Sequence, residues 1–263
     1  MHQLPLFGRV LFVDWHGVVS RDPFWLSILE NQRHPLNRRL GRAVRDLFSD
    51  NDFVTQWMLG HVSSTTVSEH VARATCSKLE SSFLARKLVR DCVGMKVNTD
   101  LMRLLRSLRP MVQVVLATDN MDCFVTALRG SKPPRRRVTS FDRLRHWVPV
   151  YDAFLCSSDI GTLKATNPEG FFGDYLEKHS LTFAQALLID DRADNCAAFV
   201  SRGGTAVQWK LESGDLGQLS AAIHRWLSPS VSEAPIARVH SGIASSVDRV
   251  SNPVQAELTL VQH

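Results

Sequence analysis

The sequence contains no long apolar run, which argues against a membrane-spanning helix. None of its 263 residues lie in a stretch approaching the roughly 20 apolar residues that such a helix needs. The apolar stretch near the N-terminus is interrupted by Asp14, and it has neither a basic leading region nor a small-residue cleavage site. We therefore expect no signal peptide and no association with a membrane.

Closely spaced cysteines and a strong excess of one charge are also missing. The five cysteines are scattered along the chain, so neither a disulfide framework nor a zinc site is expected. Scattered, reduced thiols are typical of a cytoplasmic protein. The formal net charge is only +5, which does not by itself indicate a nucleic-acid partner. Apolar residues make up 44% of the chain, enough for a large buried core.

A basic segment between residues 129 and 145 has two interpretations. A cluster of this kind is able to bind a polyanionic substrate or partner. No ladder of aromatic residues for base stacking accompanies it, however, which favours a solvated surface loop. The basic residues of the segment are Arg129, Lys132, Arg135, Arg136, Arg137, Arg143 and Arg145.

Five short apolar runs, bounded by polar or glycine-containing turns, predict the strands of a parallel sheet. Each run is apolar or β-branched at both alternating positions, which is typical of strands covered on both faces. The runs span residues 10–14, 112–118, 153–157, 186–190 and 205–209.

Helical patterns alternate with these runs. Leucines at 101, 104, 105 and 108 share one helix face, and Pro110 ends that pattern. Further helices are expected after Pro168, before Gly203 and over residues 216–226. Strands that alternate with helices predict an α/β fold with a Rossmann-like, doubly wound parallel sheet.

Residues 21–97 interrupt this alternation, since they show helical spacing and no convincing strand. The segment is expected to form an α-helical cap domain, inserted after the first strand and covering the carboxyl end of the sheet. The α/β core domain would then comprise residues 1–20 and 98–227. Residues 228–263 lack a clear periodicity, which predicts a disordered tail.

Polar residues follow the strands at the edge where an open parallel sheet binds its ligands. Asp14 ends the first run, Thr118 the second, and Asp190 the fourth, with Asp191 next; Lys164 follows the third. Carboxylates suit Mg²⁺, whereas a hydroxyl and an ammonium suit an anion. One carboxylate, Asp14, would remain free to attack, which predicts phosphoryl transfer through an aspartyl-phosphate.

Four motifs carry these residues, and their order resembles that of the haloacid dehalogenase-like (HAD) superfamily. They read FVDWHGVV, VVLATDN, SSDIGTLKATNPEGFF and LLIDDRADNCAAF. The resemblance extends over about residues 9–210, and it is to the subgroup with a helical cap after the first motif. It includes the cap segment WMLGHVSSTTVSEHV. The resemblance implies a Mg²⁺-dependent hydrolase that acts on a phosphorylated small molecule.

The resemblance also implies roles for individual residues. Asp14 would be the nucleophile and a Mg²⁺ ligand, together with the backbone carbonyl of His16. Asp190 and Asp191 would complete the metal site. Substrate phosphate would be held by Thr118, Asn120 and Lys164, although Thr118 and Asn120 would alternatively cap the helix after the second strand.

His16 stands where phosphatases of this superfamily carry a second aspartate, which protonates the leaving oxygen and later activates water. Imidazole has an unperturbed pKa of about 6.5, so it suits both tasks near neutral pH. Two alternatives stay open. One is a metal-independent 2-haloacid dehalogenase, against which the paired acids Asp190 and Asp191 argue; the other is a catalytically weak binding or regulatory protein. Substrate identity and oligomeric state are not predicted.

Overall fold

The computed structural model describes residues 8–75, 81–130 and 143–228. Within these residues, five parallel strands form one sheet in the order β3-β2-β1-β4-β5. The central strand β1 (Val10–Val13) lies between β2 (Gln113–Thr118) and β4 (Ala186–Asp190). The edges are β3 (Ala153–Cys156) and β5 (Thr205–Gln208). The predicted parallel sheet is confirmed, and its order reverses between β1 and β4, where such folds place their ligands.

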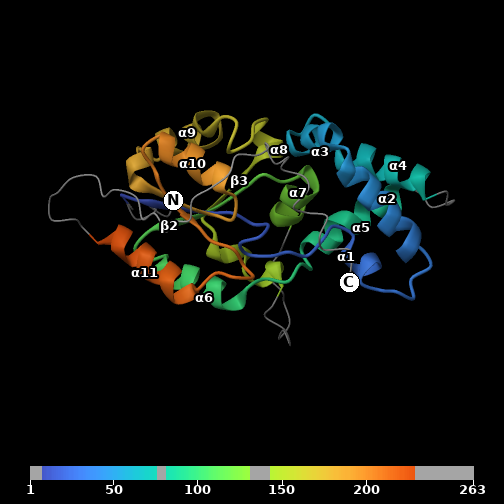
Figure 1. Ribbon diagram of the computed structural model, residues 1–263, viewed down its shortest axis with the longest axis horizontal. Helices are drawn as coiled ribbons and strands as arrows, with labels where there is room; N and C mark the ends of the chain where they lie inside the picture. The colour runs from blue at the N-terminus through green and yellow to red at the C-terminus, as the bar shows by residue number, and fades with distance from the viewer. Residues whose placement is uncertain (1–7, 76–80, 131–142, 229–263) are drawn as a thin grey trace, which may run out of the picture.

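Helices cover both faces of the sheet, because alternate side chains of each strand point to opposite sides. One face packs on α6 (Thr99–Leu108) and α11 (Leu216–Leu227). The other packs on α9 (Pro168–Lys178) and α10 (Ala193–Ser201). Figure 1 shows these two helix layers above and below the strands. The predicted doubly wound α/β fold is therefore confirmed.

An aromatic cluster attaches α9 and α10 to the centre of the sheet. The ring of Phe12 in β1 lies 4.8 Å from that of Phe172 in α9. Phe172 in turn meets Phe199 of α10 edge-to-face, with 4.9 Å between the ring centroids. All three side chains are fully buried. Rings in contact at these distances stabilise a core beyond the area that they bury.

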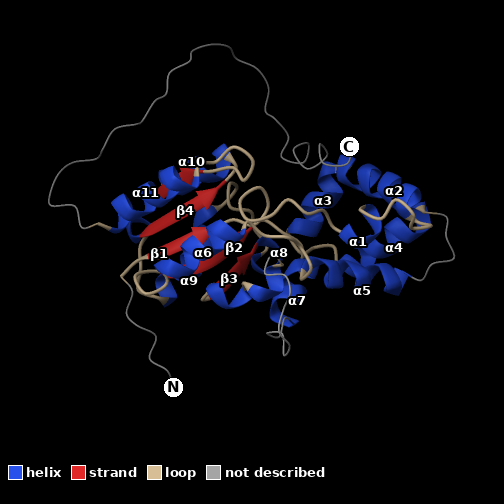
Figure 2. Cartoon of the chain, turned by 90° about the horizontal axis from the view of Figure 1, so that it is seen from below, coloured by secondary structure: helices blue, strands red, loops and turns tan. Residues whose placement is uncertain are grey.

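The segment between β1 and α6 is helical, and no strand occurs in its described residues. Figure 2 shows these helices as a group beside the sheet. The group comprises α1 (Leu26–Leu29), α2 (Asn37–Ser49), α3 (Asn51–Met58), α4 (Ser64–Ala74) and α5 (Ser81–Cys92).

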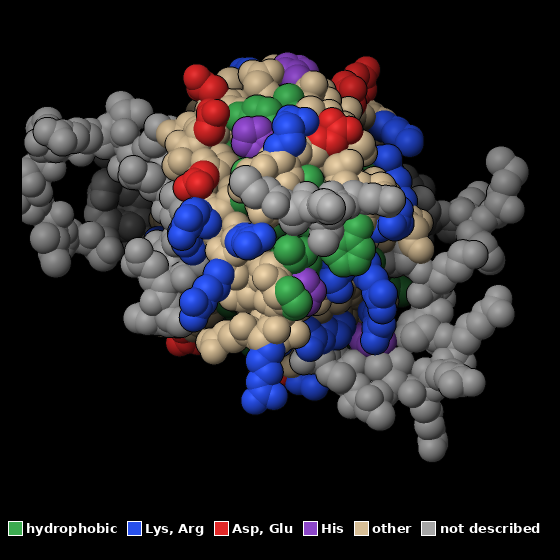
Figure 3. All heavy atoms as spheres, turned by 90° about the vertical axis from the view of Figure 1, so that its right-hand side faces the viewer, with side chains coloured by type: hydrophobic (Ala, Val, Ile, Leu, Met, Phe, Trp, Pro, Cys, Tyr) green, Lys and Arg blue, Asp and Glu red, His purple; other side chains and the backbone are tan. Residues whose placement is uncertain are grey.

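Local sequence explains where these helices begin and which way they face. The Asp50 side chain caps α3 by accepting a hydrogen bond from the Phe53 N–H, and Ser63 caps α4 in the same way. The outer surface carries many Lys and Arg side chains (Figure 3), and on α2 the exposed residues include Arg38 and Arg42. The apolar residues of α2 therefore face inward.

Two buried tryptophans connect the helical segment to its surroundings. Trp57 of α3 is fully buried, and its indole N–H donates to an Asp122 carboxylate oxygen at 3.0 Å. Asp122 begins α7 (Asp122–Gly130), the helix that follows β2. Trp25 is also fully buried and donates to the Leu84 carbonyl at 2.9 Å. Both indoles are therefore core residues whose only polar group is hydrogen-bonded.

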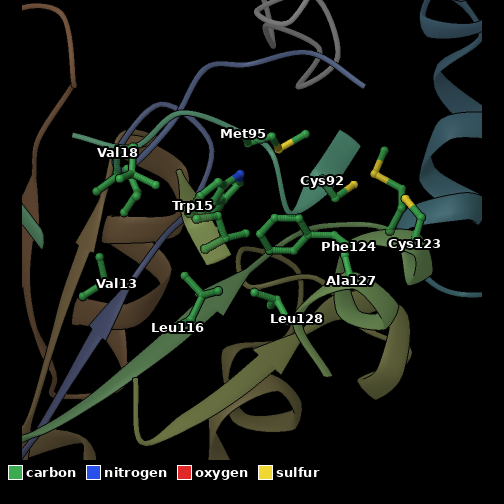
Figure 4. Close-up of a cluster of buried hydrophobic side chains, with 14 of the residues drawn as sticks. Val13, Trp15, Val18, Cys92, Met95, Leu116, Cys123, Phe124, Ala127 and Leu128 are labelled. Atoms are coloured by element: carbon green, nitrogen blue, oxygen red, sulfur yellow. The ribbon is translucent and has the colours of Figure 1, made fainter. Parts of the chain in front are cut away.

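One hydrophobic cluster continues from the sheet into the helical segment (Figure 4). Trp15, directly after β1, packs its ring 5.0 Å from that of Phe124 in α7. Cys92 of α5, Met95 and Cys123 of α7 belong to the same cluster, and both thiols are free. The helices of the segment are therefore packed directly on the sheet domain.

The remaining elements are short. They are α8 (Ser157–Ile160) and three 3₁₀ turns at Leu144–His146, Val148–Val150 and Phe183–Gln185. Among the described residues, no helix has the length and apolar character that a bilayer crossing requires.

Parts of two predicted segments lie outside the described residues, namely 131–142 of the basic segment and 229–263 of the tail. At the ends of the basic segment, Arg129 pairs with Asp159 at 2.6 Å, and Arg143 donates to the Gly94 carbonyl at 2.8 Å. These two guanidinium groups therefore have partners within the protein.

The aromatic cluster generates a stability prediction. Phe172→Ala is expected to lower the free energy of unfolding by about 3–5 kcal/mol, because it leaves a cavity under the central strand. Phe83→Ala is the matched control, since Phe83 is 37% exposed on α5 and should cost under about 1 kcal/mol. Urea unfolding of both variants measures the difference, and equal losses would contradict the packing described.

Candidate active site

Lys164 lies where the three central strands end. Its side chain is 1% exposed. The ammonium donates to Asp14 Oδ1 at 2.8 Å, to Asp190 Oδ2 at 2.5 Å and to the Ala117 carbonyl at 3.2 Å. Asp14 follows β1, Asp190 ends β4 and Ala117 belongs to β2. The loop between α8 and α9 thus brings Lys164 to the two acids with which the sequence grouped it.

The charges in this cluster do not cancel. Burial raises the pKa of Asp14; Lys164 opposes that rise, while Asp190 and Asp191 add to it. Burial alone would lower the pKa of Lys164, but the carboxylates of Asp14 and Asp190 raise it above its usual value. When both carboxylates are ionised, the one ammonium that they share leaves an excess of negative charge. A cation would therefore be stabilised at this position.

Three carboxylates at this edge fit a divalent metal ion. Asp14, Asp190 and Asp191 each offer an oxygen, and these oxygens all lie within 4.8 Å of one another. Burial, followed by repulsion from Asp190, raises the pKa of Asp191. Such a set of hard oxygen donors is what Mg²⁺ prefers. The residues present therefore fit the predicted metal.

Gly17 brings the backbone after β1 against the Asp191 carboxylate. Its φ of 79° lies in the left-handed region, which glycine adopts without strain. A Cβ added to Gly17 would lie 2.2 Å from Asp191 Oδ2, closer than any side chain permits. The Gly17 carbonyl also accepts a hydrogen bond from the Leu211 N–H at 2.7 Å. This glycine therefore allows the turn that carries His16 to approach the acids.

Thr118 and Asn120 are both buried at the end of β2, but their polar atoms differ. Within the described part of the chain, the Thr118 hydroxyl has no hydrogen-bond partner. A buried hydroxyl left unpaired is costly, so this atom is suited to bind a ligand oxygen. Asn120 Oδ1 instead accepts from the Met121 N–H at 2.8 Å, which uses its amide oxygen inside the turn.

Asp119 is a site residue that the sequence reasoning missed. One of its carboxylate oxygens accepts the backbone N–H of Lys164 at 3.1 Å, so it positions the loop that carries the ammonium. Burial raises its pKa, while the charge of Lys164 lowers it. Its position directly after β2, between Thr118 and Asn120, is the sequence feature that could have identified it as a site residue.

The start of α10 also supports the acids. Asn195 belongs to the fourth motif, and its side-chain amide donates to both oxygens of Asp190 at 3.1 Å. The Arg192 N–H donates to Asp190 Oδ1 at 2.9 Å. These bonds orient Asp190 in addition to the one from Lys164.

A cavity of about 180 Å³ opens over this cluster. The cavity lies between the helical segment and the sheet. Val54 and Met58 of α3 line one side, and residues at the carboxyl ends of the strands line the other. His16 also lines it and is partly exposed. From the sheet edge it is lined by Asp14, Asp119, Lys164, Asp191, Arg192 and Asn195, among others.

No protein-family model and no curated protein matches the sequence. Solved structures do match its fold. A HAD family enzyme from Bacteroides thetaiotaomicron superposes with a TM-score of 0.57 and 15% identity, covering 80% of this chain and 97% of that one. A predicted HAD-like family hydrolase from Porphyromonas gingivalis gives 0.59 and 15%, covering 82% and 98%.

A third match is L-2-haloacid dehalogenase from Xanthobacter autotrophicus, with chloropropionic acid covalently bound. Its TM-score is 0.53 at 12% identity, and 82% of each chain is covered. A further structure of the Bacteroides enzyme holds magnesium and inorganic phosphate, with a TM-score of 0.54, 15% identity and coverages of 80% and 98%. The chain therefore has the fold of HAD-family enzymes.

The acid cluster generates a prediction about metal binding and pH. Because the pKa values of Asp14 and Asp191 are raised, these groups keep their protons to higher pH, and Mg²⁺ must displace them. The rise in melting temperature caused by Mg²⁺ is therefore expected to be larger at about pH 8 than at about pH 5.5. Thermal melting with Mg²⁺ or EDTA at both pH values measures it; a larger rise at the lower pH would contradict the assignment.

Two glycine variants control this experiment. Gly17→Ala should lose the Mg²⁺ effect, since the new methyl group displaces the Asp191 carboxylate. Gly203→Ala has the same positive-φ strain, at 89°, but meets nothing within 4 Å. It should therefore lower the melting temperature and keep the full Mg²⁺ response.

Proposed function

We propose that the chain is a Mg²⁺-dependent hydrolase that releases phosphate from a phosphorylated small molecule. The observation that carries this proposal is the buried Lys164 ammonium, bonded to both Asp14 and Asp190 beside Asp191. Such a cluster joins a nucleophilic carboxylate, a cation for phosphate oxygens and a metal site within one cavity. The HAD-family fold and the four motifs support it.

In the first step, an oxygen of the Asp14 carboxylate attacks phosphorus. The bond between phosphorus and the leaving oxygen breaks, and that oxygen takes a proton from His16. Lys164 holds the Asp14 carboxylate in place through Oδ1. The unpaired hydroxyl of Thr118 donates to an oxygen of the transferring group, and Asn120 supports the turn beside it.

In the second step, His16 takes a proton from a water molecule, whose oxygen attacks the phosphorus of the aspartyl-phosphate. The bond from phosphorus to Asp14 breaks, which frees inorganic phosphate and restores the carboxylate. His16 lines the cavity with Asp14, and an imidazole serves as acid and then as base near neutral pH.

The metal would be held by Asp14, Asp190 and Asp191, with the His16 carbonyl as a further ligand. When bound, Mg²⁺ supplies positive charge that offsets the repulsion between phosphate and the carboxylates. Asn195 and Arg192 keep Asp190 oriented for this purpose through their hydrogen bonds.

Residues 21–97 serve in this proposal as a cap domain over a core formed by residues 1–20 and 98–227. Val54 and Met58 of α3 line the cavity opposite the acids, so the helical segment limits access of water to the reaction. The buried free thiols, such as Cys92 and Cys156, suit the reducing conditions of the cytoplasm.

Phosphate release from methyl phosphate, a small phosphate monoester, tests the proposal. Turnover is expected with Mg²⁺ and should be lost in EDTA, because the carboxylate cluster then repels the substrate. Asp14→Asn should abolish release, and His16→Gln should slow it by about 100-fold or more. Asp159→Asn is the matched control, since Asp159 is exposed and pairs with Arg129.

Other outcomes would contradict the proposal. Equal turnover with and without EDTA would refute metal dependence, and activity in Asp14→Asn would refute the nucleophile. Halide release from 2-chloropropionate without phosphate release would instead identify a metal-independent dehalogenase. Phosphate binding without any turnover would identify a binding protein.

A further inference from the structure

A second cavity, of about 50 Å³, lies beside the active-site cavity. His16 and Asp119 line both, so the two spaces meet at the residues next to the proposed reaction. We refer to this second space as the apolar chamber. Its apolar lining consists of Trp15, Pro23, Phe24, Val44, Phe48, Met95 and Met121.

The walls of the apolar chamber are firmly packed. Trp15, one residue after the proposed nucleophile, is 1% exposed and packs against Phe124 (Figure 4). Val44 and Phe48 come from the inward face of α2. Phe24 stacks against Phe48, with 6.4 Å between ring centroids. Walls made of packed aromatic rings keep their shape when a ligand enters.

Two of the charged groups that line the apolar chamber have partners in the protein. Arg21 pairs with Glu212, and Asp22 accepts the Lys96 N–H at 2.6 Å. Arg45 also lines the chamber, at its exposed margin on α2. A substrate hydroxyl group placed between the apolar walls would lose its hydrogen bonds to water without gaining new ones, which is unfavourable.

We propose that the apolar chamber binds the organic part of the substrate, and that this part is a compact apolar group. The proposal rests on the proposed function, and it names the substrate class as small alkyl phosphates, rather than sugar phosphates or nucleotides. Size supports this choice, since an apolar cavity of about 150 Å³ holds a benzene molecule. The chamber, at about 50 Å³, has room for only a few carbon atoms.

Substrate comparison tests the proposal directly. Propyl phosphate and glycerol phosphate share a carbon skeleton but differ in their hydroxyl groups. The holoenzyme with Mg²⁺ is expected to show a kcat/KM about tenfold or more higher for propyl phosphate. From methyl through ethyl to propyl phosphate, each added methylene should raise kcat/KM about fourfold. A value for glycerol phosphate equal to or above that for propyl phosphate would overturn the proposal.

Variants of residues that line the chamber test whether the chamber causes the preference for longer alkyl chains. Val44→Phe fills the chamber and is expected to remove the preference for propyl over methyl phosphate. Val200→Phe is the matched control, since Val200 is 51% exposed on α10, and it should keep the wild-type profile. Phe48→Leu enlarges the chamber and should move the optimum toward butyl phosphate, which covers the case that Val44→Phe does not fold. If a folded variant keeps the wild-type dependence of kcat/KM on chain length, the chamber does not bind the organic part of the substrate.

Binding of alkylphosphonates, which cannot be hydrolysed at the carbon–phosphorus bond, separates this inference from the proposed function. Calorimetry should show propylphosphonate binding about 16-fold more tightly than methylphosphonate. If propylphosphonate binds more tightly but no ester releases phosphate, the proposed hydrolase activity is refuted and the proposed role of the chamber stands. Phosphate release with no dependence on chain length would retain the hydrolase and refute the chamber. Equal binding of both phosphonates would also refute it.

Discussion

One buried ammonium, that of Lys164, is the interaction on which the site depends. Buried carboxylates are unfavourable unless they are paired. Lys164 bonds to Asp14 after β1, to Asp190 at the end of β4 and to a β2 carbonyl. These are the three central strands of the sheet, so the strand order determines the geometry of the site. A different order would separate the acids from the ammonium.

The chemistry proposed depends on the polar groups near this ammonium whose charge or hydrogen bonding it does not satisfy. Lys164 cannot balance two carboxylates, and Asp191 adds a third, which favours a divalent cation. The Thr118 hydroxyl, unpaired among the described residues, is suited to a phosphate oxygen. Val54 and Met58 of α3 line the other side of the cavity, and beside it α2 contributes to the apolar walls that would select the substrate.

Much of the fold was predictable because the central strands are apolar on both faces. β1, β2 and β4 are fully buried, as that pattern indicates. The same expectation was wrong for β5, whose two end residues are exposed because an edge strand has one neighbour. Asp119 was missed because its role comes from a contact with the Lys164 backbone, which no local pattern encodes. Helical spacing predicted that residues 21–97 are helical, but it could not show that Val44 lines a cavity.

The free energy of unfolding of Lys164→Met, measured by denaturation in EDTA, tests the central claim most directly. In the wild-type background the substitution is expected to cost about 3–5 kcal/mol, because it leaves Asp14 and Asp190 buried without a counter-charge. In a background carrying Asp14→Asn and Asp190→Asn, the cost should be much smaller. The same cost in both backgrounds would contradict the account.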